Sequence, residues 1–360
     1  MAYTSIDDPT LYFNTKLYTG NGSTNAITGV GFQPDWVWTK GRNDTYSHML
    51  YDSVRGATKE LNSHLTDAET TVTNSLTSFD SDGFSLGSFG ESNDTSQAFV
   101  SWNWKAGGTA SSNTDGSITS SVSASTTSGF SIVSYTGTGS NATVGHGLGA
   151  VPQTVIVKRR SSSESWMSYH EPLGNTGRLG FNFSDGVANS STYWNSTTPT
   201  SSVFSIGTNG STNASSETYI AYGFAEKKGF SKFGSYTGNG STDGTFVYTG
   251  FKPAFVIRKV TSASSDWLMQ DNKRSESGGF NQIRNYLFPN SSQAEVSNQD
   301  YFNIDFLSNG FKMRSTDGGA NGSGQSYIYM AFAENPFVTS TGIPTCARWF
   351  VLTQIVIMRL

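Results

Sequence analysis

The side chains that could carry acid–base or nucleophilic chemistry are few in this 360-residue chain, and they are scattered along it. The four histidines are His48, His64, His146 and His170, and no Gly-x-Ser-x-Gly elbow or His-Glu-x-x-His helix accompanies them. A serine hydrolase or a zinc hydrolase needs such a spacing to activate its nucleophile or to hold its metal. We therefore expect that the chain is not an enzyme and that it binds no metal or cofactor.

Carboxylates give an equally weak signal for glycoside cleavage. A glycosidase needs two carboxyl groups on opposite sides of one sugar bond. Glu164, Glu171, Asp185 and Glu217 could supply them, but no spacing selects a pair. A polysaccharide depolymerase therefore remains the least favoured of the alternative functions.

The segment Asp80-Ser81-Asp82-Gly83 resembles the start of a calcium loop, because alternating carboxylates offer oxygen ligands on a tight turn. It lacks the downstream bidentate glutamate of an EF-hand. A turn that begins with aspartate is the favoured interpretation.

The elements that position these residues recur three times along the chain. Tyr-Thr-Gly occurs at 18–20, 135–137 and 236–238, and each copy precedes a segment in which a proline stands six residues before a lysine. These prolines are Pro34, Pro152 and Pro253, and the corresponding lysines are Lys40, Lys158 and Lys259. The copies are 117 or 118 residues apart and then 101 apart, which is the size of a small domain.

Each of these segments is predicted to be a β-strand. Proline is tolerated where a strand begins, and β-branched and aromatic residues follow it in all three copies. We expect the closing lysine to return to solvent. The last strand of each copy, at 99–104, 219–224 and 327–332, alternates so that Val100, Trp102 and Trp104 share an apolar face, which we place in the core.

Composition supports an all-β fold of three tandem antiparallel β-sandwiches of jelly-roll or lectin-like type. The chain has 39 glycines, 14% charged residues and 13% aromatic residues, which is typical of turn-rich β-architecture with large buried rings. We expect the second and third sandwiches to pack closely and the first to be more independent. The predicted division is 1–107 for repeat 1, 108–128 for a Ser/Thr/Gly linker, 129–227 for repeat 2, 228–337 for repeat 3 and 338–360 for a tail.

Charge and hydropathy exclude several partner classes. The formal net charge is −4 and no basic patch is interleaved with aromatics, so nucleic-acid binding is not expected. One cysteine, Cys346, allows no intrachain disulfide. No apolar stretch approaches the ~20 residues of a membrane span, and the start of the sequence carries no secretory signal pattern.

The tail ends in a strongly apolar stretch. It could form an ordered strand between subunits or an unpaired sticky end. The candidate inter-subunit residues in it are Trp349, Phe350, Val351, Ile355, Val356 and Ile357.

Several longer strings resemble one known family. They include Tyr-Thr-Gly-Asn-Gly-Ser followed by Gly-Phe-x-Pro, and the segments 52–57, 78–84 and 331–337. They are similar to virion structural proteins of marine tailed bacteriophages, often labelled tail fibre proteins. The resemblance implies a fibre, spike or head or tail appendage of a virion, assembled in the host cytoplasm. It also implies other virion proteins as partners and a homo-oligomer, with a trimer as the expected form.

Recognition of a host surface glycan is the main alternative function. Aromatic rings that stack on sugars would lie in the variable middle of each copy, where the loops differ most. The candidates are Tyr193 and Trp194 in the second copy and Tyr286 and Phe288 in the third. A buried position in the core is the competing interpretation for each ring.

Overall fold

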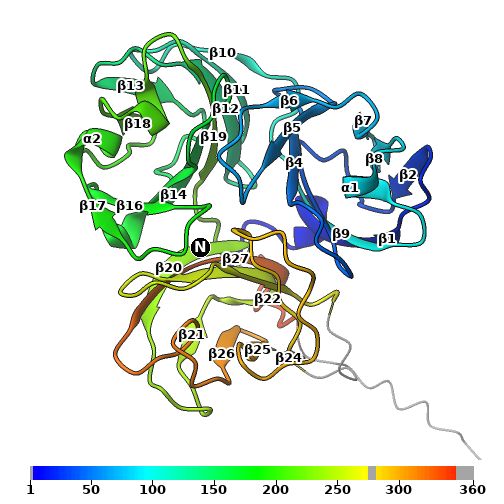
Figure 1. Cartoon of the computed structure of the whole chain (residues 1–360). Helices are drawn as coiled ribbons and strands as arrows, with labels where there is room; N and C mark the ends of the chain where they lie inside the picture. Colours follow the sequence, from blue (N-terminus) through cyan, green and yellow to red (C-terminus); the bar gives the residue numbers. More distant parts are fainter. Residues whose placement is uncertain (1–2, 275–280, 346–360) are drawn as a thin grey trace, which may run out of the picture.

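The computed structural model describes residues 3–274 and 281–345, and these residues form an almost entirely β-structure. The expected all-β fold class is confirmed. The strands fall into three consecutive regions, which Figure 1 shows around a common centre, with region 1 at the upper right, region 2 at the upper left and region 3 below.

Region 1 contains the strands β1 to β9. Its bounds are η1 Pro9–Leu11, β1 Phe13–Thr19, β2 Asn25–Thr28, β3 Trp36–Gly41, β4 Met49–Asp52, β5 Lys59–Asn62, β6 Thr70–Thr71, β7 Leu76–Asp80, β8 Gly83–Leu86, α1 Gly90–Asn93 and β9 Ala98–Trp104.

Region 2 contains the strands β10 to β19. Its bounds are β10 Ser111–Asn113, β11 Ser120–Ser125, β12 Phe130–Thr136, β13 Ala142–Gly145, β14 Thr154–Arg159, β15 Met167–His170, η2 Glu171–Leu173, β16 Gly177–Gly180, β17 Ala188–Asn189, α2 Ser191–Trp194, β18 Val203–Ile206, α3 Gly210–Asn213 and β19 Thr218–Phe224.

Region 3 contains the strands β20 to β27. Its bounds are β20 Ser231–Thr237, β21 Phe246–Tyr248, β22 Phe251–Val260, β23 Leu268–Asp271, β24 Gln282–Ile283, β25 Ile304–Leu307, β26 Gly310–Met313 and β27 Ser326–Pro336.

Each region has one large antiparallel sheet, which we call its inner sheet. The strand orders are β1-β9-β3-β4-β5-β6 in region 1, β10-β11-β12-β19-β14-β15-β16-β17 in region 2 and β20-β27-β22-β23 in region 3. In every inner sheet the last long strand of the region (β9, β19 or β27) lies between the first long strand (β1, β12 or β20) and the strand that contains the matched lysine (β3, β14 or β22).

An outer sheet accompanies each inner sheet; it has fewer strands in regions 1 and 2 and the same number, four, in region 3. The outer sheets are β2-β8-β7, β13-β18 and β21-β26-β25-β24. Apolar side chains between the two sheets form a separate core in each region; in region 1 this core joins Ile27 and Phe84 of the outer sheet to Val37 and Tyr51 of the inner sheet. Figure 1 shows the outer sheets on the far sides of the three regions.

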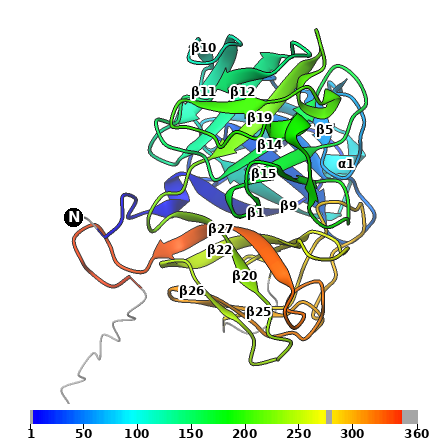
Figure 2. The ribbon, with the colours of Figure 1, turned by 90° about the vertical axis from the view of Figure 1, so that its left-hand side faces the viewer.

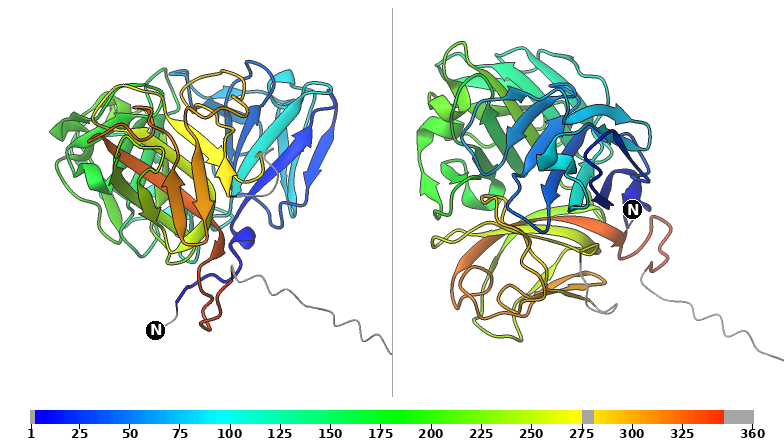
Figure 3. Two further views of the ribbon diagram at one scale, coloured as in Figure 1. Left: turned by 90° about the horizontal axis from the view of Figure 1, so that it is seen from below. Right: turned by 45° about the vertical axis from the view of Figure 1, so that its right-hand side comes forward.

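The opposite faces of the three inner sheets share a single hydrophobic core. Ring contacts join each pair of regions: Trp36 stacks on Tyr222 with centroids 4.4 Å apart, Phe13 stacks on Phe332 at 5.1 Å, and Phe224 meets Phe332 edge to face at 5.9 Å. Region 1 is therefore no more independent than the others, contrary to the expectation from the sequence. Figure 3 shows from below how region 3 lies across the junction of the other two.

The faces predicted for the last strands are confirmed. Val100, Trp102 and Trp104 all belong to the shared core, and so do the residues at the same places in β19 and β27. The strict two-residue period of a strand sends the intervening residues to the opposite face.

The segment 108–128 is not the linker that its Ser, Thr and Gly content predicts. It contains β10 and β11, and β11 pairs antiparallel with β12 from Ser121↔Ser134 to Ser125↔Phe130. Small polar residues are compatible with a strand here because backbone hydrogen bonds to β12 and the burial of Ile118 and Val122 in the core of region 2 order the segment.

The prolines begin strands in two copies and sit inside one in the third. Pro34 and Pro152 precede β3 and β14, as predicted, whereas Pro253 lies within β22. The register of β22 against β27 shifts on both sides of Pro253. A bulge is one of the few places where a strand tolerates the missing proline N–H.

Lys40, Lys158 and Lys259 do not return to solvent, contrary to the prediction; all three are fully buried. Each ammonium group donates to the carbonyl of the next residue at 2.7 Å. Lys158 and Lys259 also donate to carbonyls of the preceding region, Thr66 and Ser184, at 3.1 Å. Burial lowers the pKa of each lysine to about 8.

The two ends of the described chain lie together. Asp7 accepts hydrogen bonds from the backbone N–H and the hydroxyl of Ser340, both at 2.6 Å. Figure 2 shows the N-terminal segment beside the loop 337–345. The candidate inter-subunit residues Trp349, Phe350, Val351, Ile355, Val356 and Ile357 lie outside the described residues.

Candidate functional site

Three of the four rings expected to contact a glycan are core residues. Trp194 is 2% exposed, its indole N–H donates to the carbonyl of Gly177 at 3.1 Å, and its ring meets Tyr169 edge to face. Tyr286 and Phe288 pack edge to face on each other in the separate core of region 3. Burial leaves these three rings no face for a ligand.

Tyr193 is the exception among the four predicted ligand contacts, because it is only partly buried. The guanidinium carbon of Arg178 lies 5.3 Å from the centre of its ring. That cation–π contact occupies one face of the Tyr193 ring.

The histidines and acidic residues with possible catalytic roles are not brought together. His48, His146 and His170 are buried, and among residues 3–274 and 281–345 no group of three or more His, Cys, Asp or Glu is placed to hold a metal ion. Glu217 accepts from the hydroxyls of Ser161 and Ser162, and Glu164 pairs with Arg159 at 3.5 Å.

The turn at Asp80 to Gly83 uses its carboxylates internally. Asp82 accepts the backbone N–H groups of Gly29 at 2.9 Å and Gly31 at 2.7 Å, and these bonds lower the pKa of Asp82. Asp80 accepts the hydroxyls of Ser78 and Ser85. Both carboxylates are thus bonded within the turn and its neighbours.

A buried ionic cluster lies at the contact between regions 1 and 2, which we call seam 1–2. The carboxylate of Asp52 pairs with Arg55 and accepts the hydroxyl of Tyr222 at 2.8 Å. Glu69 bridges the two regions because it bonds Arg55 at 3.4 Å and Arg160 at 2.8 Å. Burial alone would raise the pKa of Glu69, but the hydrogen bonds and charges of the two arginines hold that pKa below its ordinary value.

The contact between regions 3 and 1, seam 3–1, repeats this cluster position by position. Asp271 pairs with Arg274 at 2.6 Å and accepts the indole N–H of Trp102 at 3.0 Å. Glu295 bonds Arg274 at 2.7 Å and Arg42 at 2.8 Å. Arg42 and Arg160 each stand two residues after a matched lysine. In both seams the glutamate of one region therefore bonds the arginine at the same position of the next region.

The contact between regions 2 and 3, seam 2–3, has neutral residues at the same positions. His170 takes the place of the aspartate, Leu173 that of the arginine, Val187 that of the glutamate and Thr261 that of the second arginine. The Nε2–H of His170 donates to the carbonyl of Tyr329 at 3.1 Å, and burial lowers the pKa of His170 to about 4. The imidazole is therefore neutral at pH 7.

One backbone hydrogen bond is common to the three seams. The N–H of Glu69 donates to the carbonyl of Arg160 at 2.8 Å, that of Val187 to Thr261 at 2.8 Å, and that of Glu295 to Arg42 at 2.7 Å. The direction is from region 1 to 2, from 2 to 3 and from 3 to 1. The contacts therefore run cyclically around the molecule.

The repeated Tyr-Thr-Gly also has a structural task. The hydroxyls of Tyr18, Tyr135 and Tyr236 donate to backbone carbonyls at 2.8, 2.7 and 2.6 Å. The glycine is required because a Cβ at Gly20 would lie 2.0 Å from the carbonyl oxygen of Asp94, and the corresponding contacts at Gly137 and Gly238 would be 2.3 and 2.4 Å.

Buried asparagines hold the same loops, and sequence reasoning missed them. The amide of Asn213 donates to the carbonyls of Ser140 and Gly207 at 2.6 and 2.7 Å, and its oxygen accepts the N–H of Thr138. Asn93 and Asn321 make the corresponding bonds. The available signal was an asparagine six residues before the aromatic of the last strand in every copy.

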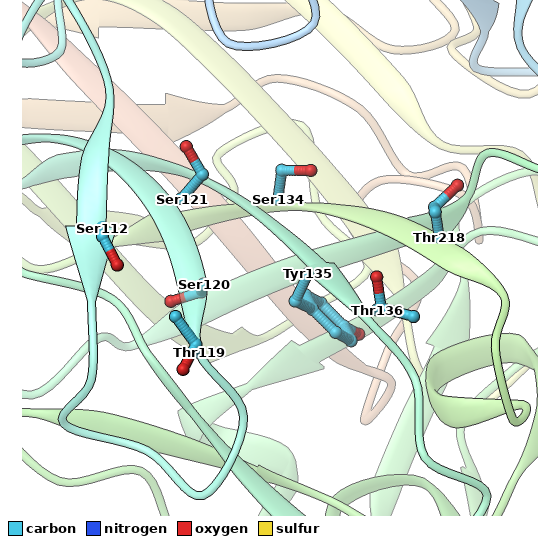
Figure 4. A pocket seen from close by; sticks show the side chains of 8 residues that line it. All are labelled: Ser112, Thr119, Ser120, Ser121, Ser134, Tyr135, Thr136 and Thr218. Carbon is cyan, nitrogen blue, oxygen red and sulfur yellow. The ribbon is translucent and has the colours of Figure 1, made fainter.

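One surface hollow, of about 330 Å³, lies on region 2. Figure 4 shows that hydroxyl side chains from β10, β11, β12 and β19 line it. Its lining has no carboxylate, imidazole or amine, so it offers hydrogen bonds but no acid–base pair. The lining residues are Ser112, Thr119, Ser120, Ser121, Ser134, Tyr135, Thr136 and Thr218.

A second and more varied pair of hollows lies on the outer side of region 3. Their volumes are about 610 and 580 Å³, and they adjoin because Thr242, Asp300 and Arg314 line both. Carboxylates, guanidinium groups, amides and the ring of Tyr301 meet here. The sequence reasoning did not select these residues, because they come from three separate loops and from the outward faces of short strands.

Comparison with known proteins gives one match. No curated protein and no solved structure matches the chain. Separately, no helix among the described residues is long and apolar enough to cross a membrane. A family model described as a domain of unknown function, DUF7483, matches residues 8–336. That match covers all three regions as one unit, from the residue that caps η1 to the end of β27. The chain therefore belongs to the DUF7483 family.

Proposed function

We propose that this protein is a non-enzymatic structural component of a bacteriophage particle, built from three tandem antiparallel β-sandwiches of one type that close into a ring. The bacteriophage assignment rests on the resemblance of the repeated motifs to virion proteins. The observation that carries the structural role is the cyclic use of matched residues as contacts between regions.

Shared strand order supports descent from one triplicated sandwich. In each inner sheet the first long strand pairs with the last, and the last pairs with the lysine strand. The hairpin partner of the lysine strand follows it in all three. Two-layer packing of an inner on an outer sheet is the arrangement of a β-sandwich.

The state of the charged groups supports a structural rather than a catalytic role. Asp52 and Asp271 are fully buried and paired with arginines three residues later. A general acid or base must reach a substrate proton, and these carboxylates face neighbouring regions instead. The remaining acidic candidates, Glu164 and Glu217, are bonded to nearby side chains.

A depolymerase is less well supported. It would need one protonated and one ionised carboxyl group across an open cleft. The outer hollows of region 3 contain Asp300 and Asp305, but each is paired with an arginine, at 3.0 and 2.6 Å. These ion pairs already engage both carboxylates.

Assembly is part of the proposal. We expect a homo-oligomer, with a trimer as the expected number, in contact with other virion proteins on the particle. Because the inner faces of the three regions cover one another, contacts with other chains would use the outer surfaces.

The test is the location of the protein in purified virions of a phage that encodes it. Mass spectrometry should detect the chain in the particle at a constant copy number, and an averaged cryo-electron microscopy map should contain three-lobed density at one appendage. Absence of the chain from washed particles, together with its presence free in the lysate, would contradict the proposal.

A further inference from the structure

The outward face of the outer sheet of region 3 differs from its counterparts in the other two regions. Phe84 of β8, Phe204 of β18 and Phe311 of β26 occupy the same place in the three outer sheets, and each is paired with an inward residue of the neighbouring strand. The residues on either side of that inward residue belong to the outward face. They are Ala26 and Thr28 in region 1 and Thr143 and Gly145 in region 2. In region 3 they are Phe246 and Tyr248, which are 44% and 58% exposed. Large exposed rings therefore occur where the other regions have small residues.

The polar hollows continue this face. Across the sheet Phe246 lies opposite Lys312, Lys312 opposite Asp305 and Asp305 opposite Gln282. With neighbouring strands ~5 Å apart, the row from Phe246 to Gln282 is ~15 Å long. Asp305 and Gln282 line the larger hollow, and Tyr301, 65% exposed, lines the adjoining one.

The hollows are lined by three aspartates, Asp300, Asp305 and Asp317, and by two arginines, so their formal charge is slightly negative. Arg314 pairs with Asp305 at 2.6 Å and Arg284 with Asp300 at 3.0 Å. Neither guanidinium group is left to attract an anion, so a phosphate, a sulfated sugar or a nucleic acid would not be favoured. Paired charges still present outward lone pairs and N–H groups, which suit the hydroxyls of a neutral ligand.

One buried acceptor at the hollow is unsatisfied. Asn303 lines it and is 4% exposed, and its amide oxygen has no hydrogen-bond partner among the described residues. Most buried side-chain polar atoms have a partner, so this amide oxygen is an exception in the wall of the hollow.

The loop that carries Tyr301 is held in place from three sides. The hydroxyl of Ser315 donates to the carbonyl of Tyr301. The buried Arg258 donates to the carbonyl of Phe302 at 2.9 Å, and the N–H of Asn298 donates to the side chain of Asn285 at 2.9 Å. A ring presented on a fixed loop loses little conformational entropy on binding.

We propose that these hollows bind a neutral, hydroxyl-rich saccharide. The ring face of Tyr301 stacks on the C–H face of one sugar unit, since the negative face of an aromatic ring attracts C–H groups. The Arg314–Asp305 and Arg284–Asp300 pairs bond the sugar hydroxyls. Phe246 and Tyr248, farther along the same face, contact further units of an extended chain.

A glycan suits this face better than a protein partner does. The core of a protein interface is apolar and depleted of charged residues, whereas here charged and amide groups occupy the centre and the rings stand at the sides. The inference is independent of the proposed virion role, because it concerns only the outer side of region 3.

The test is binding of the purified full chain to an immobilised panel of neutral hexose and N-acetylhexosamine oligosaccharides and polysaccharides. We expect at least one of them to bind, and Tyr301→Ala to weaken that binding at least ~10-fold. Asp305→Asn should also weaken it, because the ordered Arg314 pair is lost. The matched control is Tyr3→Ala, which removes a tyrosine of similar exposure, 58%, outside region 3 and should leave binding unchanged.

Thermal unfolding of the three variants separates loss of binding from loss of folding. Failure of every neutral glycan to bind the folded wild-type chain would overturn the proposal. Equal binding by wild type and folded Tyr301→Ala would also overturn it. So would a preference of the wild-type chain for anionic glycans, or a Tyr301→Ala variant that loses binding to a protein partner but not to a glycan.

Discussion

Seam 1–2 and seam 3–1 have buried ion pairs at the matched positions, whereas seam 2–3 has neutral residues there. Asp, Arg and Glu occupy three matched positions in the first two seams, and His170, Leu173 and Val187 occupy them in the third. The three positions differ as a set, as expected because a lone aspartate, glutamate or arginine from such a cluster would be buried without its ionic partner.

The connections between the regions do not follow the same division. Residues 105–110 join β9 to β10 and residues 225–230 join β19 to β20, so the two connections are equally short. Regions 3 and 1 have no direct connection. Ionic clusters therefore occur both at a seam that the chain tethers and at one that it does not. A buried ion pair contributes little net stability but specifies which surfaces meet, and this is the role we assign to it.

The largest predicted effect is the loss of one partner from an ionic seam. Arg274→Met leaves Asp271 and Glu295 buried without their shared arginine. We expect the free energy of unfolding to fall by about 3–5 kcal/mol, measured by urea denaturation.

The control for this variant is Lys232→Met, which removes the partly exposed pair with Glu226. It should change the free energy of unfolding by about 1 kcal/mol or less. Equal effects of the two variants would show that seam 3–1 is open to water.

Seam 2–3 should lower the stability of the protein in acid over a pH range that is set by His170. The pKa of His170 is about 4 in the folded chain and 6.5 ordinarily, so between these values the unfolded chain binds an extra proton. Stability therefore falls as the pH decreases from 6.5 to 4, by up to about 3 kcal/mol from this residue. His170→Gln should remove that part of the slope.

The ionic seams should respond at lower pH. The pKa of Glu295 is held below its ordinary 4.5, so the stability it contributes is lost only as the pH falls below about 4.5. Glu295→Gln should leave the slope from pH 6.5 to 4.5 unchanged. If His170→Gln changed the pH dependence of stability only below pH 4.5, the assignment of the range from pH 6.5 to 4 to His170 would be contradicted.

The three lysines predict a property that the seams share. Lys40, Lys158 and Lys259 have pKa values of about 8 in the folded chain and 10.5 ordinarily. Between pH 8 and pH 10 the unfolded chain retains protons that the folded chain has lost, so stability rises with pH. The contribution is about 1.4 kcal/mol per pH unit for each lysine.

Single Lys→Met variants test this in pH-dependent denaturation. Each should remove about one third of the lysine contribution to the rise, because the three sites are alike. A stability that is flat from pH 8 to 10 in wild type would contradict the burial of these ammonium groups.

A much smaller effect than that of Arg274→Met is expected when a whole ionic cluster is replaced by its neutral counterpart. The quadruple variant Asp271→His, Arg274→Leu, Glu295→Val and Arg42→Thr transfers the pattern of seam 2–3 to seam 3–1. Measured at pH 8, where histidine is neutral, it should be within about 1–2 kcal/mol of wild type, since complete replacement of a buried ion cluster is often close to neutral. A loss equal to that of Arg274→Met would mean that the two patterns are not interchangeable.

The sequence predicts the local elements of this fold better than their assembly. Tyr-Thr-Gly, the last-strand face of Val100, Trp102 and Trp104, and most strand positions follow from periodicity and repetition, which are local properties. The burial of Lys158 does not, because it depends on a carbonyl of another region, Thr66. Trp194 was misplaced for a similar reason: a loop position does not reveal that a short helix turns the ring inward.

The ionic seams left a partial trace in the sequence. Aspartate followed three residues later by arginine occurs at 52–55 and 271–274 and not at 170–173. Their bridging glutamates, at 69 and 295, follow at different distances because the intervening loops differ in length. The partner across the seam is not marked at all, since it lies in another region.

The central claim is that the three regions close on one shared core. A protease site inserted between Thr109 and Ala110, before β10, would allow region 1 to be separated covalently from the rest. The account predicts that the cleaved chain stays a 1:1 complex in size-exclusion chromatography with light scattering and unfolds in one cooperative calorimetric transition. Separation into two folded monomers, each with its own transition, would contradict it.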